Sequence, residues 1–468
     1  MKDAHKWWIT LILTIIAFWA GAFGLPQLAL KTRLALVIFL WAVSLWIVRP
    51  VPEYLTSIFA ATALLFLHFP GSDVLSGFAD PIWWMITFAT FLAAAIIKTG
   101  LGKRIACLLM DKMGTTLLGS LVATTMTSNI LAPFTPSNTA RGGIIYGICE
   151  GIAQAFGFKP GEKKGDHTLM LANMYINTVN TNAFLTGMGG NAIFVSLISK
   201  ATGHQITWNE WFIAAFVPAL PLMILLPFIV YKMFPSEVKT LPGGRAFVQE
   251  NLAEMGPITM GEIKTLAIML IILALWATEL VHHIPSTVVA FLIPVFLLTP
   301  YVGPVKWKDI EKEIPWAMLL WLGFAMSLAS VVNKTGGFKW LIQSLFVSSP
   351  WLSQVSFTVF MLVIILAIIF LHFLFSGMNA MGMIILPVIM ELAKARGFDP
   401  FVVGFIGALA VSTGGFFLPF NSAPNLIFYG SGRYDVADQI KGAIPLALII
   451  ALELIFALYV WWPLIGLI

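Results

Sequence analysis

Long apolar runs follow one another along the whole chain and are separated by short polar connections. A helix needs about 20 apolar residues to cross a hydrocarbon core of about 30 Å. By this criterion the pattern predicts eleven spans, near residues 7–24, 34–48, 53–69, 82–98, 168–199, 211–233, 264–281, 286–301, 315–333, 399–429 and 441–466. Because lipid offers backbone groups no hydrogen-bond partner, each span is expected to be a helix. The pattern therefore predicts an all-α polytopic membrane protein.

Two further apolar regions, about residues 104–157 and 338–395, are too long for a single helix. A polar cluster interrupts each of them near the middle. We interpret each region as containing a re-entrant helical hairpin, with the polar cluster at its tip. The stretch 235–263 is the only sizeable polar connection, and it divides the chain into halves.

Composition and charge agree with a membrane protein. Only 10% of the residues are charged and 59% are hydrophobic, whereas about a quarter of an ordinary soluble domain is charged. The net charge of +5 includes no basic tract dense enough for nucleic acid, so lipid is the expected surrounding. Lys and Arg are more frequent in alternate connections, which predicts a cytoplasmic N-terminus, an external C-terminus and a cytoplasmic 235–263 connection.

Two short motifs recur in the two halves. Residues 137–145 align with residues 377–385 at an offset of 240, and residues 191–194 align with 425–428 at an offset of 234. Each half contains five spans and a hairpin, so an odd number of spans turns the second half upside down. Inverted repeats with broken helices are typical of secondary transporters, whose site lies between the repeats near the midplane.

The first hairpin tip contains Thr135, Pro136, Ser137, Asn138 and Thr139. Pro136 cannot continue a preceding helix, and Ser, Asn and Thr are good N-cap residues, so a new helix is expected to begin here. Its free N–H groups, its hydroxyls and the positive end of its dipole suit a carboxylate. The alternative is a capped kink that satisfies its own polar groups.

The second tip has the same place in the repeat. It comprises Phe375, Ser376, Gly377, Met378 and Asn379, and Asn379 stands where Thr139 stands in the first half. One donor at each tip would hold the two ends of a dicarboxylate. Two Gly- or Pro-rich breaks after the hairpins are expected to face the tips, and they contribute Gly189, Gly190 and Asn191 in the first half and Ser422, Ala423, Pro424 and Asn425 in the second. The alternative for these breaks is that their glycines serve packing.

Arg141 and His372 are the potentially cationic side chains nearest the tips. A charge inside the membrane costs at least about 2.5 kcal/mol on insertion scales, which favours a function for Arg141. We expect both residues to compensate the charge of an anion. The alternatives are an ion pair of Arg141 with an acid such as Glu150, and a core histidine with satisfied hydrogen bonds for His372.

Motifs for chemistry are lacking. The sequence has no Gly-rich phosphate-binding loop, HExxH motif, Cys/His metal set or Ser–His–acid spacing, so an enzyme, a metal and a cofactor are not expected. An intramembrane hydrolase would need a water-accessible His or Asp pair in adjacent spans.

The sequence resembles the divalent anion/sodium symporter family, known as DASS, from the second span onward. The resemblance rests on Ser137-Asn138-Thr139 and on the segment 418–428 with Gly430-Ser431-Gly432 after it. It implies a homodimer that works as an elevator. Its scaffold would hold spans 1–4 (residues 1–103) and 7–9 (264–335), and its moving domain would hold the hairpins with spans 5, 6, 10 and 11 (104–234 and 336–468).

One departure from the sodium-coupled members decides the predicted coupling. The second triplet, Gly377-Met378-Asn379, lacks the oxygen ligands of those members, and residues 136–143 are most similar to the exchanger branch of the family. We therefore predict sodium-independent exchange of di- or tricarboxylates, such as 2-oxoglutarate, succinate, malate, citrate or tartrate, in a bacterial inner membrane. A sodium-coupled symporter is the alternative, followed by an anion channel.

Overall fold

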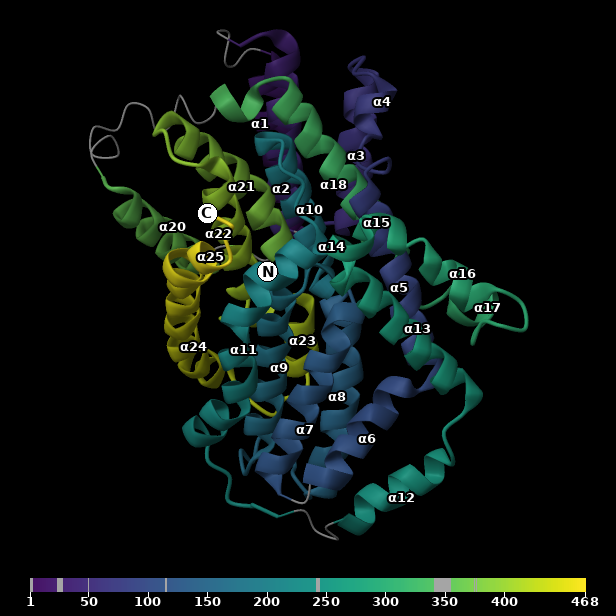
Figure 1. Ribbon diagram of the computed structural model, residues 1–468. Helices are drawn as coiled ribbons and strands as arrows, with labels where there is room; N and C mark the ends of the chain where they lie inside the picture. The colour runs from purple at the N-terminus through teal and green to yellow at the C-terminus, as the bar shows by residue number, and fades with distance from the viewer. Residues whose placement is uncertain are drawn as a thin grey trace. The chain divides into compact units, whose positions relative to one another are not determined.

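The computed structural model describes residues 3–22, 28–48, 50–113, 116–240, 245–340, 355–373, 375 and 377–468. Every regular element within these ranges is a helix, and one isolated antiparallel bridge joins Thr116 and Thr240. Figure 1 shows the helices along the chain. The all-α prediction is confirmed for this part of the chain.

Seven helical stretches of the described residues are long and apolar enough to cross a membrane. They are Pro81–Thr99, Leu117–Phe134, Trp208–Met233, Met260–Ala277, Trp316–Lys334, Met378–Ala395 and Val436–Leu464. Five shorter apolar stretches, of 10 to 17 residues, are Trp8–Trp19, Glu53–Phe66, Ser286–Leu298, Phe357–Leu371 and Pro400–Thr413. The chain is therefore polytopic, and the count of eleven spans stays a prediction.

The contacts divide the helices into two compact units. The first unit comprises Met1–Trp84, Ala192–Ile206 and Pro315–Val411. It contains α1 (Asp3–Ala22), α2 (Leu30–Val48), α3 (Glu53–Phe66), α4 (Gly71–Val74), most of α10 (Gly189–Thr202), α18 (Trp316–Lys334), α20 (Phe357–Leu371), α21 (Met378–Ala395) and most of α22 (Pro400–Thr413).

Close packing of small residues organises the first unit. Helix α18 packs on α2 and α3. The Trp83 indole N–H donates to the Leu319 carbonyl of α18 at 2.9 Å. A Cβ atom on Gly382 of α21 would lie 2.1 Å from the Phe194 ring of α10, so only glycine lets these two helices approach so closely.

The second unit comprises Met85–Asn191, Thr207–Ile314 and Ser412–Ile468. Its elements are most of α5 (Pro81–Thr99), α6 (Leu101–Met113), α7 (Leu117–Leu131), η1 (Ala132–Phe134), α8 (Asn138–Ala155), α9 (Asp166–Ala183), η2 (Leu185–Gly187), α11 (Trp208–Met233), α12 (Arg245–Met255), α13 (Met260–Ala277), α14 (Glu279–His282), α15 (Ser286–Val289), α16 (Leu292–Leu298), α17 (Trp307–Ile310), η3 (Pro419–Asn421), α23 (Ala423–Tyr429), α24 (Val436–Phe456), η4 (Ala457–Trp461) and α25 (Trp462–Leu464).

Helix α9 forms the centre of the second unit. All 18 of its residues are buried. Helices α7, α8 and α11 pack around it, and α8 also packs against α23 (Figure 1). A helix buried on every side is normally apolar. Helix α9 is instead rich in asparagine and threonine, which marks it as a candidate part of a polar site.

Several observed helices differ from the predicted spans. The predicted span 286–301 is divided into α15 and α16 by a turn at residues 290–291. Pro294 has no N–H to donate to the Ala290 carbonyl, and Ile293 N donates to that carbonyl instead at 3.1 Å. The polar connection 235–263 contains an additional helix, α12. The Arg104 guanidinium on α6 donates to the Gly256 carbonyl just after α12 at 3.0 Å.

Candidate functional site

The first predicted hairpin tip is a break between two helices. Helix α7 ends at Leu131 and is followed directly by η1, which ends at Phe134. Helix α8 begins at Asn138. Ser137 is the N-cap, and its hydroxyl accepts a hydrogen bond from Ala140 N at 3.2 Å. A new helix therefore begins where Pro136 and the N-cap residues predict it. Its first N–H groups and its positive dipole end are the kind of anion-binding feature that the sequence suggested.

Asn138 and Thr139 are the accessible polar residues of this tip. Both are half-buried, in contrast to the buried residues 131–137 before them. Neither side chain makes a hydrogen bond within the described ranges, although the Asn138 carbonyl accepts one from Asn177 Nδ2 at 3.0 Å. Their side-chain donors thus remain available to a ligand.

Arg141 lies one turn into α8 and is completely buried. Its guanidinium makes five hydrogen bonds of 2.9 to 3.0 Å to neutral oxygens: Asn177 Oδ1, Asn180 Oδ1 and the carbonyls of Thr135, Asn177 and Gly187. These bonds tie the tip to α9 and to η2. Arg141 therefore keeps its charge without an acidic partner among the described residues, and it has no donor left for direct contact with a ligand.

The alternative of an ion pair between Arg141 and Glu150 is wrong. The Glu150 carboxylate instead accepts hydrogen bonds from Arg433 at 2.6 and 3.1 Å. Arg433 lies in the connection before α24, is almost fully buried, and also approaches Asp166 to 3.7 Å. No local pattern indicates this pairing, because 283 residues separate its partners.

Four asparagines of α9 take part in this region and were missed by the sequence analysis. Asn180 Nδ2 donates to Ser128 Oγ at 3.0 Å on α7, and Asn173 Nδ2 donates to Thr124 Oγ1 at 2.9 Å on the same helix. Asn177 contacts the tip, and Asn182 lies near the end of α9. The spacing of 173, 177 and 180 places three of them on one helix face, and this regular spacing was the available signal.

Asn191 fixes the break in the first half. Its Nδ2 donates to the carbonyls of Thr181 at 2.8 Å and Phe184 at 3.1 Å, and its Oδ1 accepts from Ser412 Oγ at 2.7 Å. Gly189 and Gly190 are buried at the start of α10. The amide nitrogen of Asn191 thus holds the backbone of the break, and its amide oxygen joins the break to Ser412 near the end of α22.

Asn425 fixes the break in the second half in the same way. Its Nδ2 donates to the carbonyls of Gly415 at 2.9 Å and Leu418 at 3.2 Å, which are 10 and 7 residues earlier, as in the first half. Ser422 and Pro424 are buried and Ala423 is exposed at the start of α23. The Asn425 Oδ1 atom is buried and accepts no hydrogen bond within the described ranges.

The second predicted tip also begins a helix. Gly377 is the N-cap of α21, which starts at Met378. Asn379 is half-buried, and its Oδ1 accepts no hydrogen bond from the described part of the chain. Ser376 lies outside the described residues. This tip has no side-chain cap, so its polar character rests on Asn379 and on backbone N–H groups.

His372 is the C-cap of α20 and is 1% exposed. Its Nδ1 lies 2.8 Å from the Ile368 carbonyl, and its Nε2 lies 3.1 Å from the Val411 carbonyl. Both ring nitrogens therefore already face backbone oxygens, as the core-histidine alternative expects. Direct contact with a ligand would require one of these interactions to break.

The predicted site residues fall into both units. Ser137 to Thr139, Arg141, Gly189 to Asn191 and Ser422 to Asn425 belong to the second unit. Within it, a Cβ on Gly142 would lie 2.8 Å from Pro424 Cβ and 3.2 Å from Asn177 Nδ2, so the first tip helix lies close against both α23 and α9. His372 and Gly377 to Asn379 belong to the first unit, so a clamp of two tips stays a prediction.

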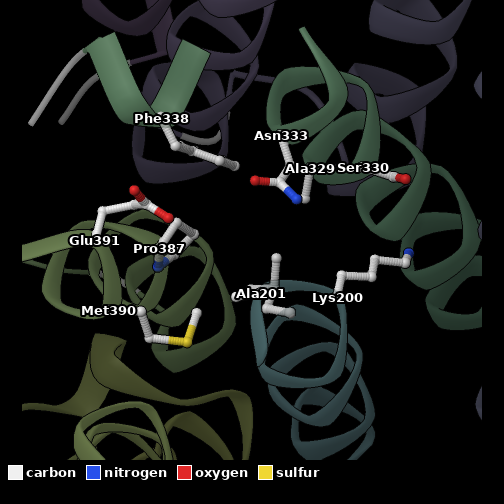
Figure 2. A pocket seen from close by; sticks show the side chains of 10 residues that line it. Lys200, Ala201, Ala329, Ser330, Asn333, Phe338, Pro387, Met390 and Glu391 are labelled. Carbon is white, nitrogen blue, oxygen red and sulfur yellow. The ribbon is translucent and has the colours of Figure 1, made fainter. Parts of the chain in front are cut away.

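A separate pocket lies in the first unit. Helices α10, α18 and α21 contribute most of its lining. Figure 2 shows the Glu391 carboxylate and the Asn333 amide pointing towards the cavity, and the Lys200 ammonium pointing away from it. None of the predicted site residues lines this pocket.

Known proteins resemble this chain over nearly its whole length. The family model described as the sodium:sulfate symporter transmembrane region matches residues 4–468. Inner membrane protein YbhI of Escherichia coli (strain K12) is 30% identical over 481 residues, which cover 100% of this chain and 99% of that protein. The L-tartrate/succinate antiporter of the same organism is 28% identical, over 99% of this chain and 100% of that protein.

A solved structure supports the same fold. The crystal structure of the Alcanivorax borkumensis YdaH transporter superimposes with a TM-score of 0.58 at 13% identity, and the match covers 93% of this chain and 98% of that chain. The predicted family resemblance is confirmed by the family model and by YbhI. The protein is an integral membrane transporter and not an enzyme, and the chain belongs to the family of the sodium:sulfate symporter transmembrane region, the divalent anion/sodium symporters.

Proposed function

We propose that this transporter exchanges di- or tricarboxylates, such as 2-oxoglutarate, succinate, malate, citrate or tartrate, without sodium. One observation carries this proposal. The tip of α8 presents Asn138 and Thr139, whose side chains have no partner within the described ranges, two or three residues before the completely buried cation Arg141. A carboxylate at the tip would receive hydrogen bonds from Asn138 and Thr139 and a favourable field from Arg141 and the helix dipole.

The charge of Arg141 supports exchange over sodium symport. A bound dianion needs compensating positive charge to move through a region of low dielectric constant, and sodium ions are one way to supply it. Arg141 supplies one charge permanently, because its partners are neutral oxygens. His372 would add a second charge when both ring nitrogens are protonated. A carrier that keeps these cations when empty would cross poorly without an anion, and it would therefore exchange.

The relatives support the same class of substrate. The L-tartrate/succinate antiporter of Escherichia coli is similar to this chain over 99% of the chain's length. Tartrate and succinate are both dicarboxylates, with a carboxylate at each end. In the proposed site Asn138 and Thr139 bind one end, and Asn379 of the second tip binds the other. Ser137, Gly189, Gly190, Asn191 and Ser422 to Asn425 would complete the proposed substrate site.

Counterflow in proteoliposomes tests the proposal. Vesicles loaded with unlabelled succinate should accumulate labelled succinate in choline buffer, whereas empty vesicles should not. A panel of succinate, malate, 2-oxoglutarate, citrate and tartrate inside the vesicles would rank the exchanged anions. Uptake into empty vesicles that requires external sodium would instead indicate a symporter.

Sodium-coupled symport is the second candidate, because the description of the matching family names a sodium symporter. In that case sodium should increase succinate binding, and the effect should saturate with sodium concentration. An anion channel would give currents that need no substrate on the opposite side. Recording from planar bilayers separates the channel from both carriers.

We further propose a homodimer in a bacterial inner membrane, with the N-terminus in the cytoplasm and the C-terminus outside. Its scaffold would contain residues 1–103 and 264–335, and its moving domain would contain residues 104–234 and 336–468. The moving domain would slide as an elevator between the two faces of the membrane. Labelling of single cysteines at the two chain ends in intact cells tests the orientation, and cross-linking of the purified protein tests the dimer.

A further inference from the structure

Helix α24 carries a carboxyl group that the proposed exchange does not use. Glu453 lies in the candidate span Val436–Leu464 and is 8% exposed. Ionisable residues inside a membrane are rare, and they are usually paired or functional. Glu453 therefore requires a physical explanation.

The hydrogen bonds of Glu453 are incomplete. Asn182 Nδ2 donates to its Oε1 at 3.3 Å, which is long for such a bond. Its Oε2 is buried and accepts no hydrogen bond within the described ranges, and the same is true of Asn182 Oδ1. Among the described residues, the Asn182 amide is thus the only donor that reaches the Glu453 carboxyl group, and Glu453 Oε2 and Asn182 Oδ1 both lack a donor.

No cation compensates Glu453 among the described residues. Helices α9 and α11 pack against α24, and Asn182 is the one polar partner that they bring to the carboxyl group. Arg141 uses its five donors on other residues. The remaining titratable side chains on these three helices make no contact with Glu453: Asp166, His167 and Tyr175 on α9, Glu210, Tyr231 and Lys232 on α11, and Asp438 and Lys441 on α24.

We propose that Glu453 is a proton-binding site that makes the exchange dependent on pH. A buried carboxylate with neither a cation nor enough donors is unfavourable, so it takes up a proton instead. The O–H group formed at Oε2 then donates to Asn182 Oδ1 while Asn182 Nδ2 continues to donate to Oε1, which is the paired arrangement of a carboxylic acid and a primary amide. This single proton satisfies both acceptors, and deprotonation returns it to water.

The position of Asn182 connects this proton to the first helix break. The Asn182 carbonyl accepts a hydrogen bond from the Trp211 indole at 2.8 Å. The carbonyl of the preceding residue, Thr181, accepts a hydrogen bond from Asn191 Nδ2 at 2.8 Å. A change of charge at Glu453 therefore acts directly on the end of α9, where the break begins.

The net charge sets the direction of the effect. A carrier loaded with a dianion has one negative charge fewer when Glu453 is protonated, so the protonated carrier is expected to cross the membrane faster. Exchange should fall as pH rises. This part of the inference rests on the proposed exchange, whereas the presence of the proton does not.

Infrared difference spectroscopy of the purified full-length protein tests the proton itself. The wild type should show the C=O stretch of a protonated carboxyl group at neutral pH, and Glu453→Gln should lack it. Glu262→Gln is the matched control, because Glu262 in the candidate span Met260–Ala277 is also buried but its carboxylate accepts hydrogen bonds from Arg104 and Thr259. That variant should keep the band. A band of equal size in Glu453→Gln would overturn the proposal.

Transport and a second variant complete the test. In proteoliposomes, wild-type exchange should decrease about fivefold or more from about pH 6 to about pH 9, and Glu453→Gln should change less than about twofold. Identical pH profiles would overturn the coupling even if exchange itself is confirmed. If Glu453→Gln does not fold, Asn182→Ala serves in its place. Loss of the hydrogen-bond partner should shift the C=O band, and an unshifted band would contradict the proposal.

Discussion

The two helix breaks use the same backbone device with different electrostatics. Asn191 and Asn425 each donate to the carbonyls 7 and 10 residues earlier. Only the first tip has a buried arginine one turn into its helix, because Arg141 corresponds to the buried Met381 at the offset of 240. Asn177, whose Oδ1 and carbonyl oxygen accept hydrogen bonds from the Arg141 guanidinium, corresponds to Val411 at the offset of 234. The two breaks therefore share their architecture, whereas the buried arginine beside the tip is present in the first half and absent at the equivalent position of the second.

The two tip helices, α8 and α21, likewise share their packing but differ in their polar surroundings. Gly142 and Gly382 correspond in the repeat, and each permits close packing against a helix that follows a break: α8 against Pro424 of α23, and α21 against Phe194 of α10. The surroundings differ, because α9 beside the first tip is rich in asparagine and α22 in the second half is apolar. In the proposed site, Arg141 of the first half would supply positive charge near the substrate, and the second half has no arginine at the equivalent position.

The largest expected effect follows from making the first half resemble the second. Arg141→Met would remove five hydrogen bonds in a buried site and leave the Oδ1 atoms of Asn177 and Asn180 without a donor, and each orphaned acceptor costs about 1 to 3 kcal/mol. We expect a loss of stability of roughly 3 kcal/mol or more. Thermal unfolding in detergent measures it, with Met381→Leu as the control, expected to cost less than about 1.5 kcal/mol. Equal unfolding temperatures of Arg141→Met and wild type would break the comparison.

Replacing the two asparagines of the breaks should destabilise the protein to different extents. Asn191→Ala removes two donated bonds and the acceptor of Ser412 Oγ, whereas Asn425→Ala removes only two donated bonds. We expect destabilisation of about 2 to 4 kcal/mol for Asn191→Ala and about 1 to 3 kcal/mol for Asn425→Ala. Unfolding by heat under identical detergent conditions ranks them. A larger effect at Asn425 would show that its unpaired Oδ1 has a partner outside the described residues.

Substrate binding should depend on the polar residues of both tips. Asn138→Ala, Thr139→Ala and Asn379→Ala each remove one proposed donor to a carboxylate, which is worth roughly 1.5 to 3 kcal/mol, or about tenfold to a hundredfold in affinity. Binding of labelled succinate measures the effect, and Thr139→Ser should retain binding because it keeps the hydroxyl. Normal affinity of all three alanine variants would eliminate the site between the two tips.

The smallest expected effects concern the paired glycines. Gly382→Ala and Gly142→Ala should each cost about 1 to 3 kcal/mol through overpacking. Gly143→Ala is the matched control, because nothing lies within 4 Å of its added Cβ. It should be neutral or stabilise α8 by up to about 1 kcal/mol. If Gly142→Ala behaves like Gly143→Ala, the close packing of α8 against α23 is not required for stability.

The sequence predicted the breaks because local chemistry determines them. Pro136 with the N-cap Ser137 predicted the start of α8, and the Gly- and Pro-rich segments predicted the interruptions after α9 and α22. The alternating apolar runs predicted the helical class. The apolar run 286–301 predicted one span where the structure has two short helices, α15 and α16. The turn of two residues between them does not change the hydropathy of the run.

The partners of the charged residues could not be predicted in the same way. Glu150 pairs with Arg433, which is far away in sequence, so no local pattern distinguishes this pair from one with Arg141. The asparagines of α9 could have been recognised from their regular spacing. Their role as neutral acceptors for Arg141 depends on how α8 packs against α9, which the sequence alone does not specify.

A structure determined by cryo-electron microscopy with bound succinate tests the central claim most directly. We predict density for one carboxylate at the N-terminus of α8, within hydrogen-bond distance of Asn138 and Thr139, with Arg141 beneath it in its observed contacts. Density for succinate in the pocket near Lys200 and Glu391, with the tip of α8 unoccupied, would contradict the account.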